Sequence, residues 1–229
     1  MSDAMKCKIV TFDEVHALVR QLSQKVKASG FRPTTVVGLA RGGWVPARLI
    51  CDFLGITDLV SLKVEHWLET GRTKDEATIR YPLDLDFSQK RILVVDDITD
   101  TGKSLIKATR YLRRLRPLAM KTATLQFIPK SQFTPDYCVE EVHEWTWFIY
   151  PWNWIEDTTT LIVRLMTTER DQEWSLKAIG EGLSRLFQIV WDAEFLTHIL
   201  ATMVERGQVI PVEGVPLTYR IVSERVVTL

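Results

Sequence analysis

The sequence predicts an α/β fold, in which a parallel sheet is flanked by helices, with a small α+β unit at the carboxyl end. Short β-branched runs alternate with helical repeats as far as Phe127, as in parallel sheets covered on both faces. After Ile155 the pattern changes to a helix pair followed by a hairpin. We therefore expect two domains, residues 1–154 and residues 155–229.

The first part of the chain supplies two helices and two strands. Apolar residues recur at helical spacing after Thr11, with acidic residues in the first turn, where they stabilise a helix. Residues 34–39 are short, β-branched and nearly all apolar, which is typical of a buried parallel strand. Residues 40–43 break this pattern, and a helix and a strand are predicted over residues 45–54 and 58–64.

A polar segment, residues 66–82, then interrupts the alternation. It is charged and poor in core residues, so we expect a long mobile excursion. The alternation resumes with a strand, a helix and a strand over residues 91–95, 101–115 and 121–127. Ligands of such sheets bind where the carboxyl ends of strands lead into helices, which makes residues 40–43 and 96–104 the candidate site segments.

The carboxyl-terminal part resembles a winged-helix module. Helices are predicted over residues 174–190 and 194–206, and a hairpin over residues 209–222 turns near Glu213 and Gly214. From Ile155 onward the chain carries seven Lys and Arg against eleven Asp and Glu, a net charge of −4. This sign disfavours contact with a phosphate backbone, so dimerisation or covering of the site is the expected role.

Composition limits the other partners. Lys and Arg number 29, as do Asp and Glu, so the balanced chain gives no overall signal for nucleic acids or membrane surfaces. The three cysteines are far apart and show neither disulfide nor zinc spacing, which predicts reduced, mostly buried thiols. A signal peptide and an apolar run of about 20 residues are both absent from the sequence. We expect a cytoplasmic protein without membrane or nucleic-acid partners.

Residues 92–104 carry the clearest chemical signal. An apolar strand delivers Asp96 and Asp97, and a polar turn then enters a helix at Thr101–Ser104. Backbone N–H groups and hydroxyls at such a helix start favour a phosphate. The two carboxylates suit ribose hydroxyls or a hydrated Mg²⁺ ion.

This segment has two other interpretations. Paired aspartates could simply cap a helix. Gly102, Lys103 and Ser104 also match the end of a nucleoside-triphosphate loop, but that motif requires glycine where Asp97 stands. A carboxylate there would repel the phosphates, so the second interpretation fails.

The segment resembles the phosphoribosyl diphosphate signature of the type I phosphoribosyltransferases. The resemblance extends over Val36–Asn153 and implies that family's fold, Mg²⁺ as cofactor and phosphoribosyl diphosphate as substrate. Asp96 and Asp97 are then the ligands of the ribose hydroxyls and, directly or through water, of the metal. The implied cradle of the 5′-phosphate consists of Asp100, Thr101, Gly102, Lys103 and Ser104.

Asp100 narrows the resemblance to the 6-oxopurine branch of the family. In that branch an aspartate begins the loop and faces purine N7, where it can accept a proton as general base. Adenine and orotate enzymes usually have a small or hydroxyl residue instead. The other interpretation of Asp100 is an ordinary turn or helix-capping residue.

Residues 36–43 resemble the family's diphosphate-binding loop. Gly42 and Gly43 allow close approach of the backbone, and Arg41 can pair with diphosphate oxygens. The resemblance also implies a cis peptide bond between Ala40 and Arg41. A glycine turn after a strand is common, so this loop is a weak signal alone.

The purine-binding parts are implied by two further matches. Lys130 follows a strand and corresponds to the residue that donates to purine O6, while Trp147 corresponds to the ring that stacks on the base. Phe148 and Asn153 mark the backbone that meets the N2 edge. Core packing of these aromatics, with Lys130 as a surface residue, is the other interpretation.

Residues 66–81 occupy the place of the family's flexible flap. The usual Ser-Tyr pair is absent, and Glu65, His66 and Trp67 stand in that region. The flap's chemical contribution is therefore not assigned, and His66 is taken as an ordinary loop histidine.

The sequence thus predicts a magnesium-dependent purine-salvage transferase that moves phosphoribosyl to hypoxanthine, guanine or xanthine. The alternatives are a transcriptional regulator that senses phosphoribosyl diphosphate on the same fold and binds nucleic acid, and a phosphoribosyltransferase for another base. Relatives of this family lead us to expect a homodimer or a higher homo-oligomer.

Overall fold

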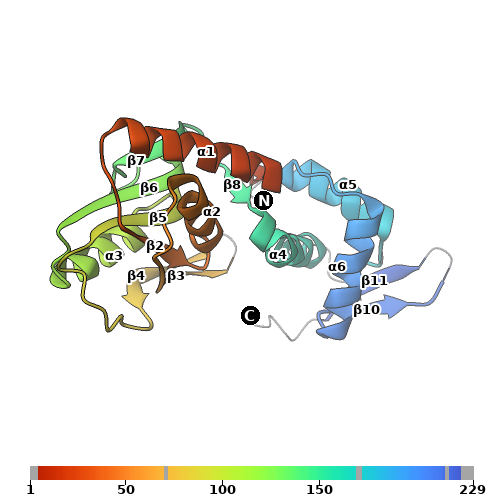
Figure 1. Ribbon diagram of the computed structural model, residues 1–229. Coiled ribbons are helices and arrows are strands. Elements are labelled where there is room, and N and C mark those ends of the chain that lie inside the picture. Colours follow the sequence, from red (N-terminus) through yellow and green to blue (C-terminus); the bar gives the residue numbers. More distant parts are fainter. Residues whose placement is uncertain (1–4, 70–71, 169–171, 215–216, 223–229) are drawn as a thin grey trace. The chain divides into compact units, whose positions relative to one another are not determined.

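The computed structural model describes residues 5–69, 72–168, 172–214 and 217–222. The chain forms two compact units (Figure 1). The first unit consists of residues 1–10, 69–72 and 146–229, and the second of residues 11–68 and 73–145. The boundary expected after residue 154 lies within the first unit. It stays a prediction.

The second unit is built on a six-stranded sheet with the order β4-β3-β2-β5-β6-β7 (Figure 1). Its strands are β2 (Thr35–Ala40), β3 (Leu59–Glu69), β4 (Arg72–Ile79), β5 (Arg91–Thr99), β6 (Ala119–Phe127) and β7 (Tyr137–Glu141). Strand β2 pairs in parallel with β3 and β5, and β6 pairs in parallel with β5 and β7. The predicted parallel sheet is confirmed.

The prediction of an irregular excursion over residues 66–82 is wrong for most of that range. Strand β3 continues to Glu69, and β4 occupies Arg72–Ile79. The backbone N–H of Arg80 also donates to the carbonyl of Lys63 at 3.0 Å. An edge strand is held by such backbone bonds, so a count of core residues does not reveal it. The predicted flap covers residues 66–81, and the side chains of residues 66–77 lie outside the described part.

Helices cover both faces of this sheet. They are α1 (Phe12–Ala28), α2 (Trp44–Leu54) and α3 (Lys103–Arg114). Val37 and Val94 pack with Leu105 of α3 in one core cluster. On the other face of β2, a Cβ atom at Gly38 would lie 2.7 Å from the Cβ of Ala47 in α2. Because side chains alternate along a strand, α2 and α3 lie on opposite faces.

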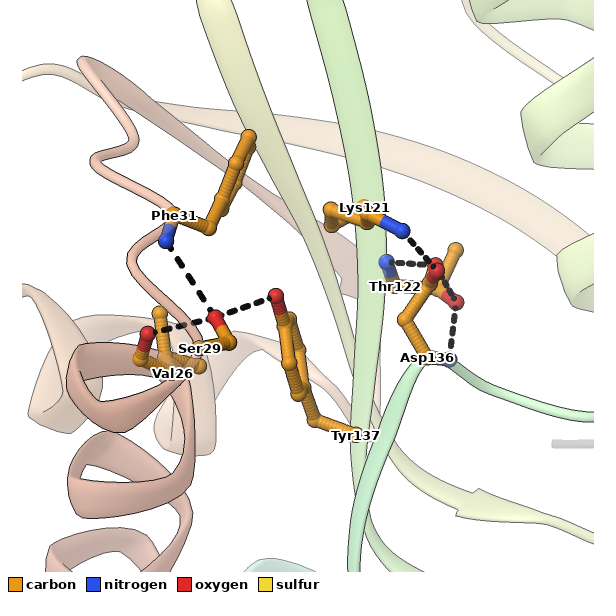
Figure 2. Close-up of polar contacts among 7 residues, drawn as sticks. All are labelled: Val26, Ser29, Phe31, Lys121, Thr122, Asp136 and Tyr137. Carbon is orange, nitrogen blue, oxygen red and sulfur yellow. Dashed lines mark hydrogen bonds and ion pairs between the residues drawn. The ribbon is translucent and has the colours of Figure 1, made fainter.

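The end of α1 is fixed by a serine. The hydroxyl of Ser29 donates to the carbonyl of Val26 at 2.8 Å and accepts from the N–H of Phe31 at 3.2 Å. The same hydroxyl lies 2.7 Å from the hydroxyl of Tyr137 at the start of β7 (Figure 2). These contacts connect α1 to the edge of the sheet.

Asp136 closes the connection between β6 and β7. Its carboxylate accepts from Nζ of Lys121 at 2.7 Å, and from the N–H and the hydroxyl of Thr122 at 2.8 and 2.9 Å (Figure 2). Partial burial pushes the pKa of Asp136 upward. The hydrogen bonds from Lys121 and Thr122 outweigh this effect and leave the pKa below its ordinary value.

The first unit has the layout expected of a winged-helix module. Strand β1 (Cys7–Ile9) pairs in parallel with β8 (Trp147–Ile149). There follow η1 (Pro151–Asn153), α4 (Trp154–Thr167), β9 (Trp174–Ser175), α5 (Leu176–Phe187), α6 (Ala193–Glu205), β10 (Val209–Val212) and β11 (Thr218–Ile221). The last strands form an antiparallel sheet with the order β10-β11-β9, which confirms the predicted helix pair and hairpin.

Helix α4 was not predicted from the sequence. Its run of Thr158, Thr159 and Thr160 is β-branched, which lowers helix propensity. Two of these threonines are nevertheless buried, so tertiary packing determines the helix. Helix α5 approaches α4 closely, since a Cβ atom at Gly182 would lie 2.6 Å from a methyl carbon of Leu165.

The three cysteines are free thiols. Cys7 in β1 and Cys51 in α2 are buried, with 5% and 2% of their surface exposed. Burial raises the pKa of Cys7 to about 12 and that of Cys51 to about 11. Cys138 is half-buried, and burial raises its pKa as well. Among the described residues no helix is both long and apolar enough to cross a membrane.

Candidate active site

Three neighbouring strands bring their carboxyl ends to one edge of the sheet. Gly38 of β2 pairs with Val95 of β5, and Thr99 of β5 pairs with Phe127 of β6, all in parallel. The segments that follow these strands therefore meet at the same edge. They are residues 41–43, 100–102 and 128–132.

The glycine loop after β2 lies against the acidic pair that ends β5. A Cβ atom at Gly42 would overlap the carboxylate of Asp97, and one at Gly43 would lie 2.8 Å from the Cα of Asp96. Neither position has room for a side chain. The peptide bond between Ala40 and Arg41 is cis, as the resemblance implied, and Arg41 is exposed beside it.

The two carboxylates differ in their surroundings. The N–H of Asp97 donates to Oδ1 of Asp96 at 3.1 Å, and the N–H of Ile98 donates to Oδ1 of Asp97 at 2.8 Å. Burial and the adjacent charge of Asp97 hold the pKa of Asp96 well above its usual range. A cation at this position would relieve the repulsion between the two carboxylates.

The turn after β5 begins helix α3. Gly102 has a φ of +79° at the helix start, a conformation that favours glycine. A Cβ atom there would lie 2.6 Å from Oγ of Ser131, so the turn packs against the segment after β6. The carbonyl of Thr101 also accepts from the N–H of Gln132 at 3.1 Å. Lys103 and the half-buried Ser104 lie in the first turn of α3, where a phosphate is favoured.

A depression of about 370 Å³ lies beside this turn. Four predicted site residues line it, namely Asp100, Thr101, Lys103 and Lys130. Burial raises the pKa of Asp100 above its ordinary value. The depression therefore holds one carboxylate that can take up a proton, next to two lysine side chains.

Four further residues line the same depression and were not predicted from the sequence. They are Ile128, Gln132, His143 and Trp145. Trp145 is 45% exposed, so its ring offers an accessible apolar surface. Nε2 of His143 lies 3.9 Å from a carboxylate oxygen of Glu141. A signal was present for Trp145, which stands two residues before the tryptophan chosen from the resemblance.

The other predicted purine-binding residues belong to the first compact unit. Trp147 of β8 packs against the core of that unit, and its backbone N–H donates to the carbonyl of Lys6 at 2.9 Å. The rings of Phe148 and Tyr150 stack with centroids 6.2 Å apart. Asn153 ends η1 and precedes α4. Their roles toward a purine stay predictions.

The fold and the site together define a class of protein. A parallel α/β sheet presents a glycine loop, a pair of carboxylates and a phosphate-favouring helix start at one edge, as in proteins that bind phosphorylated ribose. The model of the phosphoribosyl transferase domain family matches residues 11–157. The chain belongs to this family, and the predicted resemblance is confirmed.

Similar proteins include purine enzymes. Xanthine-guanine phosphoribosyltransferase of Cereibacter sphaeroides is 32% identical over 152 residues, covering 63% of this chain and 85% of that protein. The enzyme of the same name from Gluconobacter oxydans is 30% identical over 156 residues, covering 67% and 86%. A crystal structure of purine phosphoribosyltransferase from Pyrococcus horikoshii is 30% identical with a TM-score of 0.56, and the similarity covers 65% of this chain and 94% of that one.

Proposed function

We propose that this protein is a purine-salvage phosphoribosyltransferase. It transfers the 5-phosphoribosyl group from phosphoribosyl diphosphate to a 6-oxopurine and releases diphosphate. The observation that carries the proposal is the shared depression, where Asp100, the phosphate turn and Lys130 lie together. The purine enzymes to which the chain is similar support the choice of base.

The phosphorylated sugar binds at the ends of β2 and β5. The turn Thr101–Ser104 holds the 5′-phosphate through backbone N–H groups, hydroxyls and Lys103. Asp96 and Asp97 accept hydrogen bonds from the ribose hydroxyls, and Arg41 and Gly42 hold the diphosphate. Asp97 can fill this position because Gly42 leaves room for its carboxylate.

The acidic pair also fits a magnesium ion that arrives with the substrate. No cluster of three or more His, Cys, Asp or Glu able to hold a metal occurs among the described residues. Mg²⁺ commonly uses one or two carboxylates together with substrate oxygens and water. Asp96 and Asp97 would hold it directly or through the ribose hydroxyls. When bound, the ion neutralises negative charge on the departing diphosphate.

The base is recognised by a hydrogen-bond donor, Lys130, and by a hydrogen-bond acceptor, Asp100. Lys130 donates to the oxygen at C6, which disfavours the amino group of adenine at that position. Asp100 faces N7 and can accept its proton. By the resemblance, Trp147 stacks on the ring, while the backbone near Phe148 and Asn153 meets the N2 edge.

The reaction exchanges one bond at C1 of the ribose. The bond from C1 to the diphosphate oxygen breaks, and its electron pair leaves with the diphosphate. Purine N9 forms the new bond to C1, while the proton of N7 passes to Asp100. The remaining site residues act by positioning and by stabilising the separating charges.

A panel of bases tests the proposal. The purified protein is mixed with Mg²⁺, phosphoribosyl diphosphate and one of hypoxanthine, guanine, xanthine, adenine, uracil or orotate. We expect nucleotide only from the 6-oxopurines. Binding of phosphoribosyl diphosphate without turnover of any base would contradict the enzyme and favour a sensor. Formation of adenine or pyrimidine nucleotide would contradict the choice of base.

We also propose that the protein works in the cytoplasm as a homodimer or higher homo-oligomer. Its chemistry uses substrates of cytoplasmic nucleotide metabolism. Light scattering coupled to size-exclusion chromatography measures the mass of the assembly. A mass equal to the 26.4 kDa chain would contradict the oligomer.

A further inference from the structure

Positive charge is concentrated on and around helix α3. Residues 101–135 contain eight Lys and Arg and no Asp or Glu. Three of these eight cations already have an assigned position, since Lys103 and Lys130 line the depression and Lys121 forms an ion pair with Asp136. The other five form what we call the α3 basic face: Lys107, Arg110, Arg113, Arg114 and Arg116.

The geometry of the helix places these side chains together. Lys107, Arg110 and Arg114 are separated by three and four residues, so they lie on one side of α3. Arg113 flanks them, and Arg116 follows the end of the helix. The four arginines are exposed and Lys107 is half-buried. Seven residues of helix extend about 10 Å, so the cations form a continuous row.

The structure supplies no charge partner for this row. None of the five side chains makes an ion pair or a hydrogen bond with any residue in the described ranges. Acidic residues occur nearby on the segment that Tyr111 holds through Leu83. Of these, Asp86 accepts from the N–H of Ser88 at 2.8 Å. The α3 basic face therefore remains available to a partner.

Its chemistry indicates the kind of partner. Arginine predominates, and its planar group suits phosphate oxygens better than lysine does. Tyr111 is half-buried and bonded through its hydroxyl, so α3 offers no exposed ring for stacking on single-stranded bases. From Lys103 onward, Leu118 is the first exposed large apolar side chain in the described chain, so α3 lacks an outer apolar face for a membrane.

We propose that the α3 basic face binds the phosphate backbone of double-stranded nucleic acid without reading its sequence. Phosphates of one strand recur about every 3.4 Å along a duplex, so a row of about 10 Å meets roughly three of them. This differs from the expectation of no nucleic-acid partner, which relied on the zero net charge of the chain and on the net charge of −4 from Ile155 onward. The proposal goes beyond the transferase reaction and does not depend on it.

Fluorescence anisotropy with labelled random-sequence duplexes of about 20 base pairs, one of RNA and one of DNA, provides the test. With roughly three phosphates neutralised, the affinity falls about 40-fold between about 50 and 200 mM salt. The duplex that binds more tightly shows whether the partner is RNA or DNA. No binding of either duplex at about 50 mM salt would overturn the proposal.

A double variant examines the row directly. Arg110→Gln with Arg114→Gln removes two cations outside the depression, so phosphoribosyl transfer is expected to remain unchanged. Duplex affinity at about 50 mM salt should fall at least about 10-fold. The slope of log affinity against log salt concentration should become shallower by the amount that corresponds to about two neutralised phosphates. The control, Arg20→Gln with Arg48→Gln, changes the same charge at exposed positions of α1 and α2 and should bind like the parent.

Two more results would contradict the proposal. One is equal loss of binding in the α3 variant and in the control, which indicates an effect of overall charge. The other is binding to phosphatidylserine vesicles with none to duplexes, which assigns the row to a membrane surface. Because these measurements use neither phosphoribosyl diphosphate nor a free purine base, a failed base panel leaves them interpretable.

Discussion

The buried position of Asp100 should determine how the activity responds to acid. Only the ionised carboxylate can accept the purine proton, and burial raises its pKa. Activity should therefore fall as the pH decreases through a value above the ordinary aspartate pKa of about 3.9. The Asp100→Asn variant should lose this acid limb and about 100-fold or more in kcat.

The rate of nucleotide formation measured across pH checks this prediction. The exposed Asp84 provides the control, since Asp84→Asn makes the same chemical change away from the site. An Asp100→Asn enzyme that keeps both its rate and its acid limb would show that Asp100 is a turn residue.

Gly42 should be intolerant of the smallest side chain. A methyl group there overlaps the carboxylate of Asp97, which must then move from the ribose position. Displacement of a site residue by about 1 Å can cost about 100-fold. We expect Gly42→Ala to lower kcat/KM for phosphoribosyl diphosphate by about 10- to 100-fold. Steady-state kinetics measure this change. Unchanged kinetics of the variant would contradict the proposed binding of the diphosphate by the glycine loop.

Single residues of the site were predictable where they are adjacent in the sequence. Asp96, Asp97 and Asp100 stand within five positions, and the strand before them fixes where they emerge. Gln132 and His143 were missed because they reach the depression from separate loops after β6 and β7. Which loop residues line a depression depends on how the loops fold, and spacing alone does not contain this information.

At the scale of elements, Asp136 should stabilise the connection of β6 to β7. Removing its carboxylate in Asp136→Ala leaves the buried Thr122 without this acceptor, at a cost of about 2 kcal/mol in the free energy of unfolding. Its folded-state pKa is lowered, so the stabilisation is fully present above about pH 4 and is lost as the pH falls through the folded-state pKa.

Urea unfolding of the parent and of Asp136→Ala at a series of pH values measures this difference. The difference should be largest near neutral pH and shrink in acid. Asp84→Ala removes an exposed carboxylate and should leave the unfolding free energy nearly unchanged. A difference that grows in acid would contradict the assigned direction of the pKa.

Two glycines of α5 should respond in opposite ways to alanine. A Cβ atom at Gly180 meets only Leu196, at an ordinary 3.5 Å, so Gly180→Ala should stabilise the helix by up to about 1 kcal/mol. At Gly182 it collides with Leu165, which is fully buried, so Gly182→Ala should destabilise by about 1–3 kcal/mol. Thermal unfolding of both variants provides the comparison, and a stabilised Gly182→Ala would contradict the close packing of α4 and α5.

Elements were predictable where the hydrophobic pattern determines them. Buried strands β2 and β5 and the amphipathic α1 follow directly from their sequences. Strand β4 is polar, and α4 is rich in β-branched residues, so in both cases tertiary contacts prevail over local preference. Strand β4 contains no apolar repeat, whereas in α4 Leu161, Ile162, Leu165 and Met166 do recur at helical spacing and were overlooked.

Across the whole molecule, the zero net charge conceals a separation of charge. Residues 101–135 carry a charge of +8, whereas the part from Ile155 onward carries −4. A sum over the chain cannot show this, because opposite contributions cancel. Surface electrostatics therefore has to be assessed segment by segment.

The two deeply buried thiols provide one chemical reporter for each compact unit. Cys7 belongs to the first unit and Cys51 to the second. At about pH 8, a thiol with a pKa near 11 has a fraction of reactive thiolate roughly 200-fold smaller than a free cysteine with a pKa of about 8.5. Cys7 and Cys51 should therefore both resist alkylation until their own unit opens.

In a Cys138→Ser background, mass spectrometry after timed exposure to iodoacetamide gives the two labelling rates separately. Fast labelling of either thiol in the native protein would contradict its burial. Different slow rates would mean that the transferase-like sheet and the winged-helix-like part open as independent structures. Equal rates would mean that the chain opens as a single cooperative body.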